Sequence, residues 1–251
     1  MPGFFQAVAA APSISTPSPG GIVTSDLLAH LDAANAASYP GSGTLWYDLV
    51  NSYDVSLLNG AAYNALGGGS IRFDGVNDYG RNTSFAWGAL TSWSVEGWVY
   101  ATKTNADGTF FGAQWSLPTF NYGGLFYLDV GDGAYGYDCV FYQTDQLVVR
   151  TGFTDPNAVA NLWQHIVFVG DGVNKEVRLY VDNVHRGTGY LTEGTDFRYS
   201  TTSGFAIGSE RSTTAARLFG GYVAQVRIYS SPFTSTEVAQ NWNATRTNFG
   251  R

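Results

Sequence analysis

Asn-Gly and Asp-Gly pairs recur along this chain, and they are the feature that most constrains its fold. The pairs are Asn59-Gly60, Asp74-Gly75, Asp107-Gly108, Asp132-Gly133 and Asp171-Gly172. Each pair supplies the positive φ angles that tight β-hairpin turns require. The segments between them are rich in β-branched and aromatic residues, which favour strands. The sequence therefore predicts an all-β chain of short antiparallel strands.

Several segments have the composition and length of strands. They are Ser70–Asp74, Trp93–Ala101, Thr109–Gln114, Leu125–Val130, Cys139–Gln143, Leu147–Thr151, Gln164–Gly170, Glu176–Asp182, Phe205–Ser209 and Gly221–Tyr229. Alternation is clear in Val177, Leu179 and Val181, which share one face of a strand because successive side chains point to opposite faces. Residues 166–169 are apolar on both faces, so we expect that strand to lie centrally.

A single helix is expected near the C-terminus. Thr234 and Glu237 have the spacing of a capping box, in which each side chain accepts a hydrogen bond from the other residue's backbone amide. Val238 and Trp242 then lie four residues apart on one helix face. Many short strands and one terminal helix predict a two-sheet antiparallel jelly-roll sandwich, formed as one domain by residues 22–251.

Residues 1–21 differ from the rest of the chain and are interpreted as an extended N-terminal arm. Four prolines and the Gly20-Gly21 pair oppose regular structure. Phe4 and Phe5 precede an alanine-rich run, so the arm is either a solvated tail or a docking segment that buries both rings in a partner. The arm has no Lys or Arg, so it lacks the basic region of a signal peptide. Its apolar run is too short to span a bilayer.

The charge balance argues against two classes of partner. The formal net charge is −7, and the 13 basic residues are scattered along the chain. A protein that follows a phosphate backbone needs clustered Lys and Arg, so nucleic acid is not an expected partner. The acidic surplus also repels anionic membranes. The single cysteine, Cys139, cannot form an internal disulfide and is expected to be a small buried hydrophobic residue.

Six stretches that cover nearly all of the chain after the arm resemble a known family. They are LLAHLDAANAASYPGSGTLWYDL (Leu27–Leu49), SIRFDGVNDYG (Ser70–Gly80), WSVEGWVYA (Trp93–Ala101), WQHIVFVGDGVNKEVRLYVDNVHRGTG (Trp163–Gly189), FAIGS (Phe205–Ser209) and GGYVAQVRIYSSPFTSTEVAQNWNATRTNFG (Gly220–Gly250). Their order resembles the laminin-G-like jelly-roll domains of the concanavalin A-like lectin/glucanase superfamily. The first and last stretches are similar to single-domain copies carried by bacteriophages. The resemblance implies the fold more strongly than the function, because these stretches are mostly core and turn residues.

Two functions are compatible with this resemblance. The first is a non-enzymatic structural and interaction module on a virion surface, as a capsid decoration or fibre-associated protein. The arm would attach it to other virion proteins in a symmetric, oligomeric assembly. The second is a glycan-binding adhesion lectin that is not tied to a particle. Burial of Phe4 and Phe5 in a partner discriminates the two, because only the assembly role requires it.

Glycoside hydrolysis is a distant third reading. It needs two carboxylates that flank the scissile bond, and the enzymes of the superfamily carry them as Glu-x-Asp-x-x-Glu on one strand. This chain has five Glu, and none has an acidic neighbour two residues away. Glu96, for example, has Ser94 and Trp98 at those positions. We therefore expect no catalytic residues and no enzymatic activity.

Aromatic residues beside Gly or Pro supply a candidate ligand or partner surface. Trp115, Tyr122, Tyr135 and Tyr137 are expected to be exposed in loops, because their neighbours in sequence favour turns. Tyr and Trp rings stack on sugar rings, and the same rings form good protein interfaces. The alternative is that rings in this region belong to the core.

Calcium is a weaker possibility, and no cofactor is expected. Some relatives bind calcium at one rim of the sandwich, where a Glu-Gln-Asp run follows a strand. Glu210 matches the first of these positions, but Arg211 and Ser212 replace the other two. If calcium binds, Asn105 and Asp107 are the expected partners of Glu210, because calcium takes several oxygen ligands.

A second group of oxygen-bearing residues, Asp74, Asn77 and Asp78, is interpreted as structural. Asp74 precedes Gly75 in a turn signal. Asp and Asn side chains in such turns accept hydrogen bonds from the backbone a few residues away. The group is therefore expected to hold a turn rather than a metal ion.

Overall fold

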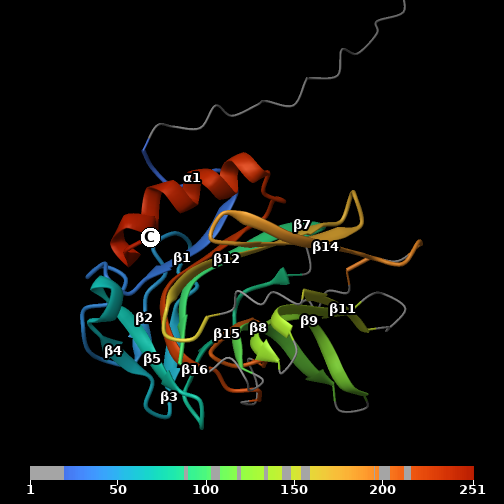
Figure 1. Ribbon diagram of the computed structural model, residues 1–251. Coiled ribbons are helices and arrows are strands. Elements are labelled where there is room, and N and C mark those ends of the chain that lie inside the picture. Colours follow the sequence, from blue (N-terminus) through green and yellow to red (C-terminus); the bar gives the residue numbers. More distant parts are fainter. Residues whose placement is uncertain are drawn as a thin grey trace, which may run out of the picture.

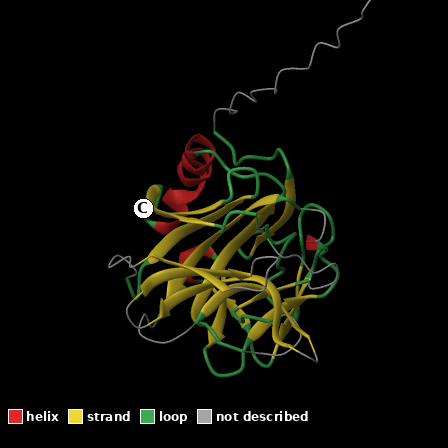
Figure 2. Ribbon diagram, turned by 90° about the vertical axis from the view of Figure 1, so that its right-hand side faces the viewer, coloured by secondary structure: helices red, strands yellow, loops and turns green. Residues whose placement is uncertain are grey.

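The computed structural model describes residues 20–251, except for residues 88–89, 103–107, 118–119, 133–134, 143–147, 154–158, 195, 198–203 and 212–215. Between residues 114 and 153 it describes strand backbone, together with the side chain of Tyr137. The described chain forms two antiparallel sheets and one α-helix (Figures 1 and 2). This confirms the predicted all-β sandwich. The predicted arm, with Phe4 and Phe5, lies outside the described residues except for Gly20 and Gly21.

The first sheet, sheet A, has the strand order β14-β13-β12-β7-β16-β5-β4, and β1 also pairs with β16. Its strands are β1 Leu27–Asp32, β4 Ala62–Asn64, β5 Ser70–Asp74, β7 Ser92–Ala101, β12 Trp163–Asp171, β13 Glu176–Val181, β14 Val184–Tyr190 and β16 Gly220–Tyr229. One edge of β16 is shared, because residues 220–223 pair with β5 and residues 225–229 pair with β1. Strands β7 and β12 lie inside the sheet, and the exposure pattern of both is buried almost throughout.

The second sheet, sheet B, has the order β11-β10-β9-β8-β15-β6-β3-β2. Its strands are β2 Leu45–Trp46, β3 Val55–Leu58, β6 Tyr79–Asn82, β8 Thr109–Leu117, β9 Phe120–Asp132, β10 Tyr135–Tyr142, β11 Val148–Phe153 and β15 Phe205–Ile207. Strands β8 to β11 follow one another in sequence and pair as antiparallel neighbours. They therefore form a meander at one side of the sheet.

The main core lies between the two sheets. Its largest members include Trp93 of β7, Phe110 and Phe111 of β8, and Phe205 of β15, each essentially inaccessible to solvent. Alternation explains the arrangement in β7, because Val95 and Val99 enter this core while Glu96 and Trp98 point to the other face. The outer face of sheet A therefore needs a cover of its own.

Helix α1 (Ser235–Thr245) and the 3-10 turn η3 (Arg246–Phe249) supply that cover. Figure 1 shows α1 lying along sheet A, close to β1 and β12. Val238 of α1 packs with Val167 and Val169 of β12, and Phe249 packs with Trp98. The predicted capping box is confirmed, since the amide of Glu237 donates to Thr234 Oγ1 and the amide of Thr234 donates to the Glu237 carboxylate. Among the described residues, no helix has the length and apolar character needed to cross a membrane.

All ten predicted strands are present, although some ends differ. The strand expected over Phe205–Ser209 ends at Ile207, because Gly208 turns with a φ of 78° and packs against the Phe73 ring. Six further strands were not predicted from the sequence, namely β1, β2, β3, β4, β6 and β14. Most of these are short or lack a run of β-branched residues, so the sequence pattern that predicted the other strands is too weak in them.

Candidate ligand surface and a buried charge cluster

The four predicted surface aromatics lie on three neighbouring strands of sheet B but not at one place. Trp115 of β8 pairs with Gly123 of β9, so the backbones of Trp115 and Tyr122 lie close together. Tyr135 of β10 pairs with Asp132, at the far end of β9. At about 3.3 Å per residue, the nine steps from 123 to 132 span about 30 Å. Trp115 and Tyr122 therefore lie at one end of β9, and Tyr135 lies at the other.

Tyr137 is not a surface residue, and this prediction was wrong. Its side chain is 2% exposed and belongs to the core between the sheets. The hydroxyl donates to Oε1 of Gln164, on β12 of the opposite sheet. Buried tyrosines are stable where the hydroxyl has such a partner. Gly136 suggested a loop in the sequence, but the strand runs through it from Tyr135 to Tyr142.

The carboxylate of Glu210, the first proposed calcium ligand, forms ion pairs with two arginines. It is 4% exposed, and its carboxylate lies 3.1 Å from Nε of Arg217 and 3.4 Å from Nε of Arg211. Asn105 and Asp107 lie outside the described residues. Within the described part of the chain, no group of three or more His, Cys, Asp or Glu side chains is arranged to hold a metal ion. The calcium site stays a prediction, and Glu210 has an alternative role as the centre of an ion-pair group.

The turn at Asp74 has the structural role expected for it. One carboxylate oxygen of Asp74 accepts the amides of Val76, Asn77 and Asp78 at 2.8, 3.1 and 3.2 Å. These hydrogen bonds, with the amide of Val76 first, hold the pKa of Asp74 below its ordinary value. Asp78 in turn accepts the amide of Asp74 at 3.0 Å. The two carboxylates therefore close the turn between β5 and β6.

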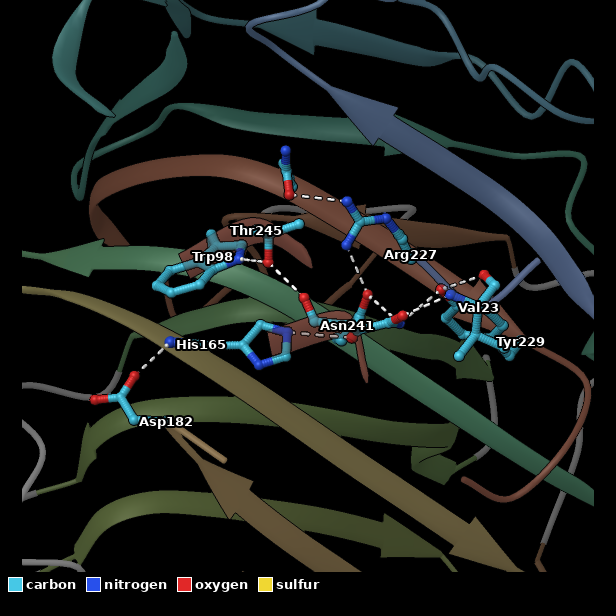
Figure 3. Close-up of polar contacts among 10 residues, drawn as sticks. Val23, Trp98, His165, Asp182, Arg227, Tyr229, Asn241 and Thr245 are labelled. Atoms are coloured by element: carbon cyan, nitrogen blue, oxygen red, sulfur yellow. Dashed lines mark hydrogen bonds and ion pairs between the residues drawn. The ribbon is translucent and has the colours of Figure 1, made fainter. Parts of the chain in front are cut away.

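A buried charge cluster lies on the outer face of sheet A, beneath α1 (Figure 3). Glu96 of β7 is its centre, and its side chain is 1% exposed. Oε1 of Glu96 lies 2.7 Å from Nη1 of Arg227 on β16, and Oε2 lies 3.1 Å from Nε2 of His165 on β12. Asn241 of α1 donates to Oε1 at 3.0 Å. Three strands and the helix thus meet at one carboxylate.

The cluster extends in two directions from this carboxylate. Asn241 also donates to the hydroxyl of Tyr229 at 3.0 Å and accepts the backbone amide of Val23 at 2.7 Å. Arg227 donates through Nη2 to Gln225 at 2.9 Å. The start of the described chain, sheet A and the C-terminal helix are therefore joined by one continuous hydrogen-bond network.

Burial and charge act in opposite directions on Glu96. Burial alone would raise its pKa, but Arg227 and the hydrogen bond from His165 outweigh burial and lower the pKa of Glu96 to about 2. His30, which pairs with Arg227 in the strand register, has its pKa lowered to about 3 by burial and by the charge of Arg227. Burial raises the pKa of Tyr229 well above its ordinary value. At neutral pH the cluster therefore holds an ionised Glu96 and a neutral His30.

The geometry of the cluster favours a structural role over a chemical one. His165 is fully buried beside the stacked rings of Trp98 and Trp242, at centroid distances of 5.1 and 6.0 Å from them. The indole nitrogen of Trp98 donates to Thr245 of α1 at 2.9 Å. None of these residues was predicted from the sequence to form a cluster. A single charged residue within each of two otherwise uncharged strands, Glu96 in β7 and Arg227 in β16, was the signal available.

The structure is similar to a sialidase, to a domain of an arabinanase and to the binding domain of a mosquitocidal protein. A Trypanosoma rangeli sialidase in complex with sialic acid matches with a TM-score of 0.64 and 16% identity, over 92% of this chain and 35% of that chain. Domain 4 of the extracellular arabinanase AbnA from Geobacillus stearothermophilus, in complex with arabinotriose, matches with a TM-score of 0.62 and 17% identity, over 88% of this chain and 98% of that one. The binding domain of Paraclostridial Mosquitocidal Protein 1 matches with a TM-score of 0.64 and 12% identity, over 87% and 52%.

These similarities establish the fold, and the sequence establishes the family. The chain spans about a third of the length of the sialidase, so that likeness concerns part of a larger protein. No curated protein matches the sequence. A family profile of the concanavalin A-like lectin/glucanases superfamily matches residues 74–239, which is more than half of the chain. The chain therefore belongs to the concanavalin A-like lectin/glucanases superfamily.

Proposed function

We propose that the chain is a non-enzymatic interaction module, which displays a carbohydrate-binding jelly roll and is attached to a larger assembly, a virion surface, through its N-terminal arm. The observation that carries the binding role is the uneven cover of the two sheets. Helix α1 and η3 pack on sheet A, and no helix of the described chain packs on sheet B. Figure 1 shows the meander β8 to β11 on the side away from α1.

The ligand surface of this proposal is the end of sheet B that carries Trp115 and Tyr122. The register places their backbones close together, because Trp115 lies opposite Gly123, the residue that follows Tyr122. Sugars present apolar ring faces together with hydroxyls, and aromatic side chains offer flat apolar area with few rotatable bonds. The arabinanase domain supports the proposal, because a domain of almost the same extent is described in complex with arabinotriose.

The positions of the glutamates support a role other than hydrolysis. Glu96, Glu210 and Glu237 are engaged by Arg227, by two arginines and by the helix cap, respectively. Glu176 lies 3.2 Å from Nε of Arg178, and Glu193 is exposed beyond the end of β14. A glycosidase needs two carboxyl groups that face one another across the substrate. Four of the five glutamates of this chain are instead engaged in separate structural contacts.

A glycan array tests the binding role. The labelled chain is expected to bind a restricted set of glycans, and Trp115→Ala and Tyr122→Ala are expected to weaken that binding. Tyr190→Ala is the matched control, because Tyr190 is 68% exposed on β14 of the other sheet. Binding that survives both sheet-B substitutions, or that Tyr190→Ala removes, would contradict this surface.

The attachment role rests on how firmly the start of the described chain is held. Gln240 of α1 donates to the carbonyl of Gly21 at 2.9 Å, and the amide of Val23 donates to Asn241. The arm therefore leaves the domain from a fixed point beside α1. A chain that lacks residues 2–19 is expected to fold and bind glycan as before but to be absent from purified particles. Full incorporation of the truncated chain would refute the docking role while leaving the binding role intact.

A further inference from the structure

A row of paired residues crosses the outer face of sheet A where the helical cover ends. Tyr222 of β16 pairs with Arg72 of β5 on one side and with Tyr100 of β7 on the other. Tyr100 in turn pairs with Trp163 of β12. Residues directly opposite one another on antiparallel strands place their side chains on the same face, about 5 Å apart. The four side chains therefore form one continuous line, here called the Arg72–Trp163 row.

Exposure increases along this row. Trp163 is buried at 6%, Tyr100 and Tyr222 are half-buried, and Arg72 is exposed. The buried end is held beneath the C-terminal turn, since the rings of Trp163 and Phe249 lie 5.0 Å apart. Gly67 closes the other side of Trp163, because a Cβ added there would lie 2.7 Å from the indole. The row therefore runs from Trp163, which Phe249 and Gly67 cover, to Arg72 on the exposed surface.

The two tyrosine rings are fixed by edge-to-face packing. The ring of Tyr100 lies 5.7 Å from that of Tyr222 at 80° and 5.5 Å from that of Trp163 at 63°. Each contact is of the favourable T-shaped kind. Within the described residues, neither tyrosine hydroxyl has a hydrogen-bond partner, so both remain available to a ligand. A surface that is already ordered loses less entropy when a ligand binds.

The polar end of the row carries an available positive charge. Arg72 makes no ion pair among the described residues. Asp74, two residues along the same strand, accepts the backbone amides of its own turn, and the charge of Arg72 lowers the pKa of Asp74 only through space, as the smallest of the causes that act on it. A guanidinium group presents planar donors that match both oxygens of a carboxylate. The expected ligand is therefore an anion with an apolar ring attached to it.

We propose that the Arg72–Trp163 row binds a hexuronate residue of an acidic polysaccharide. The carboxylate of the sugar pairs with Arg72, and one face of its pyranose ring lies against Tyr222 and Tyr100. In a hexuronate the carboxylate is attached directly to the ring, which suits side chains on strands about 4.8 Å apart. This inference gives the proposed carbohydrate-binding function a second site, on the other sheet from Trp115 and Tyr122.

Calorimetric titration with trigalacturonate, at low salt and neutral pH, tests the site. Binding is expected for the native chain, and the methyl ester of the same trisaccharide is expected to bind at least about tenfold more weakly because it lacks the charge. Arg72→Gln is expected to raise the Kd about 10- to 100-fold. Tyr222→Ala is expected to raise it by about 2- to 10-fold. Ring proton resonances of Tyr100 and Tyr222 are expected to shift during the titration.

Arg81→Gln is the matched control, because Arg81 is a partly exposed arginine on β6 of the other sheet. Arg81→Gln is expected to leave the Kd unchanged. If Arg72→Gln and Arg81→Gln instead raise the Kd equally, the effect is one of net charge, and the proposed site is wrong. Circular dichroism establishes that each variant is folded. No binding of trigalacturonate, or equal binding of its methyl ester, also overturns the inference. These results leave the glycan-array test unaffected, because a loss of glycan binding in Trp115→Ala concerns the surface on sheet B alone.

Discussion

Glu96 and Arg227 face one another across the neighbouring strands β7 and β16, although 131 residues separate them in sequence. Their side chains are 1% and 3% exposed, and the ion pair is 2.7 Å long. Removing two charges from water costs several kcal/mol per ion, and attraction offsets this only when the remaining hydrogen-bonding groups are satisfied. His165 and Asn241 satisfy the carboxylate, and Gln225 satisfies part of the guanidinium. The pair is therefore sensitive to the loss of either member.

Glu96→Gln is expected to lower the free energy of unfolding by about 3–5 kcal/mol, because it leaves the charge of Arg227 buried without its partner. Arg227→Met is expected to have a similar cost for the same reason. The double variant is expected to lose less than the sum, since it buries neither charge. Urea unfolding measures all three. Glu193→Gln, at an exposed position, serves as the control and is expected to change stability by less than about 0.5 kcal/mol. Additive losses in the double variant would mean that the two residues act independently.

Stability is expected to fall as the pH is lowered from about 6.5 towards 2. The folded state depresses the pKa of His30 from 6.5 to about 3, so the unfolded chain binds the proton first and stability declines through this window. Glu96 is depressed from 4.5 to about 2, so its contribution is complete above 4.5 and declines below it. Urea unfolding measured across this range checks both. His30→Gln is expected to flatten the upper part of the profile and Glu96→Gln the lower part, and an unchanged profile in either variant would rule out that group.

Asn241→Ala is expected to loosen the junction between the start of the domain and α1. The substitution leaves the buried amide of Val23 without its acceptor, at a cost of about 1–3 kcal/mol, whereas the hydroxyl of Tyr229 keeps its hydrogen bond to the Val23 carbonyl. Hydrogen exchange is the direct measurement, and the amide of Val23 is expected to exchange faster in the variant. Asn243→Ala, at an exposed position on the same helix, is the control. Equal protection of Val23 in both variants would show that Asn241 does not hold this segment.

Local signals account for most of the fold that could be predicted. The capping box at Thr234 and the alternation of Val177, Leu179 and Val181 depend on residues within one turn or one strand, and the structure confirms both. Strand β14, Val184–Tyr190, was missed because its two glycines and alternating polar residues have low strand propensity. It is a strand because β13 supplies its hydrogen-bond partners. Pairing with β13, which a local sequence pattern does not contain, therefore determines that Val184–Tyr190 forms a strand.

The candidate sites depended on long-range contacts and were therefore harder to predict. The burial of Tyr137 follows from Gln164 on the opposite sheet, and nothing adjacent to Tyr137 in sequence indicates it. The row from Arg72 to Trp163 likewise draws its residues from four strands that are dispersed along the chain. The sequence supplied residue types that suit sugar binding, whereas their grouping required the strand order.

Calcium is expected to have no effect on folding stability, and the reason lies at Glu210. Its buried carboxylate is within 3.4 Å of Nε atoms of both Arg211 and Arg217, so a cation there would be repelled by two guanidinium groups and would have to displace them. Thermal unfolding with calcium and with a chelator is expected to give the same Tm, since a ligand stabilises the folded state only if it binds that state. Glu210→Gln is expected to lower stability by about 1–3 kcal/mol through loss of the ion pairs, equally in both conditions. A Tm that rises by several degrees with calcium, and no longer does so in Glu210→Gln, would instead identify Glu210 as a ligand.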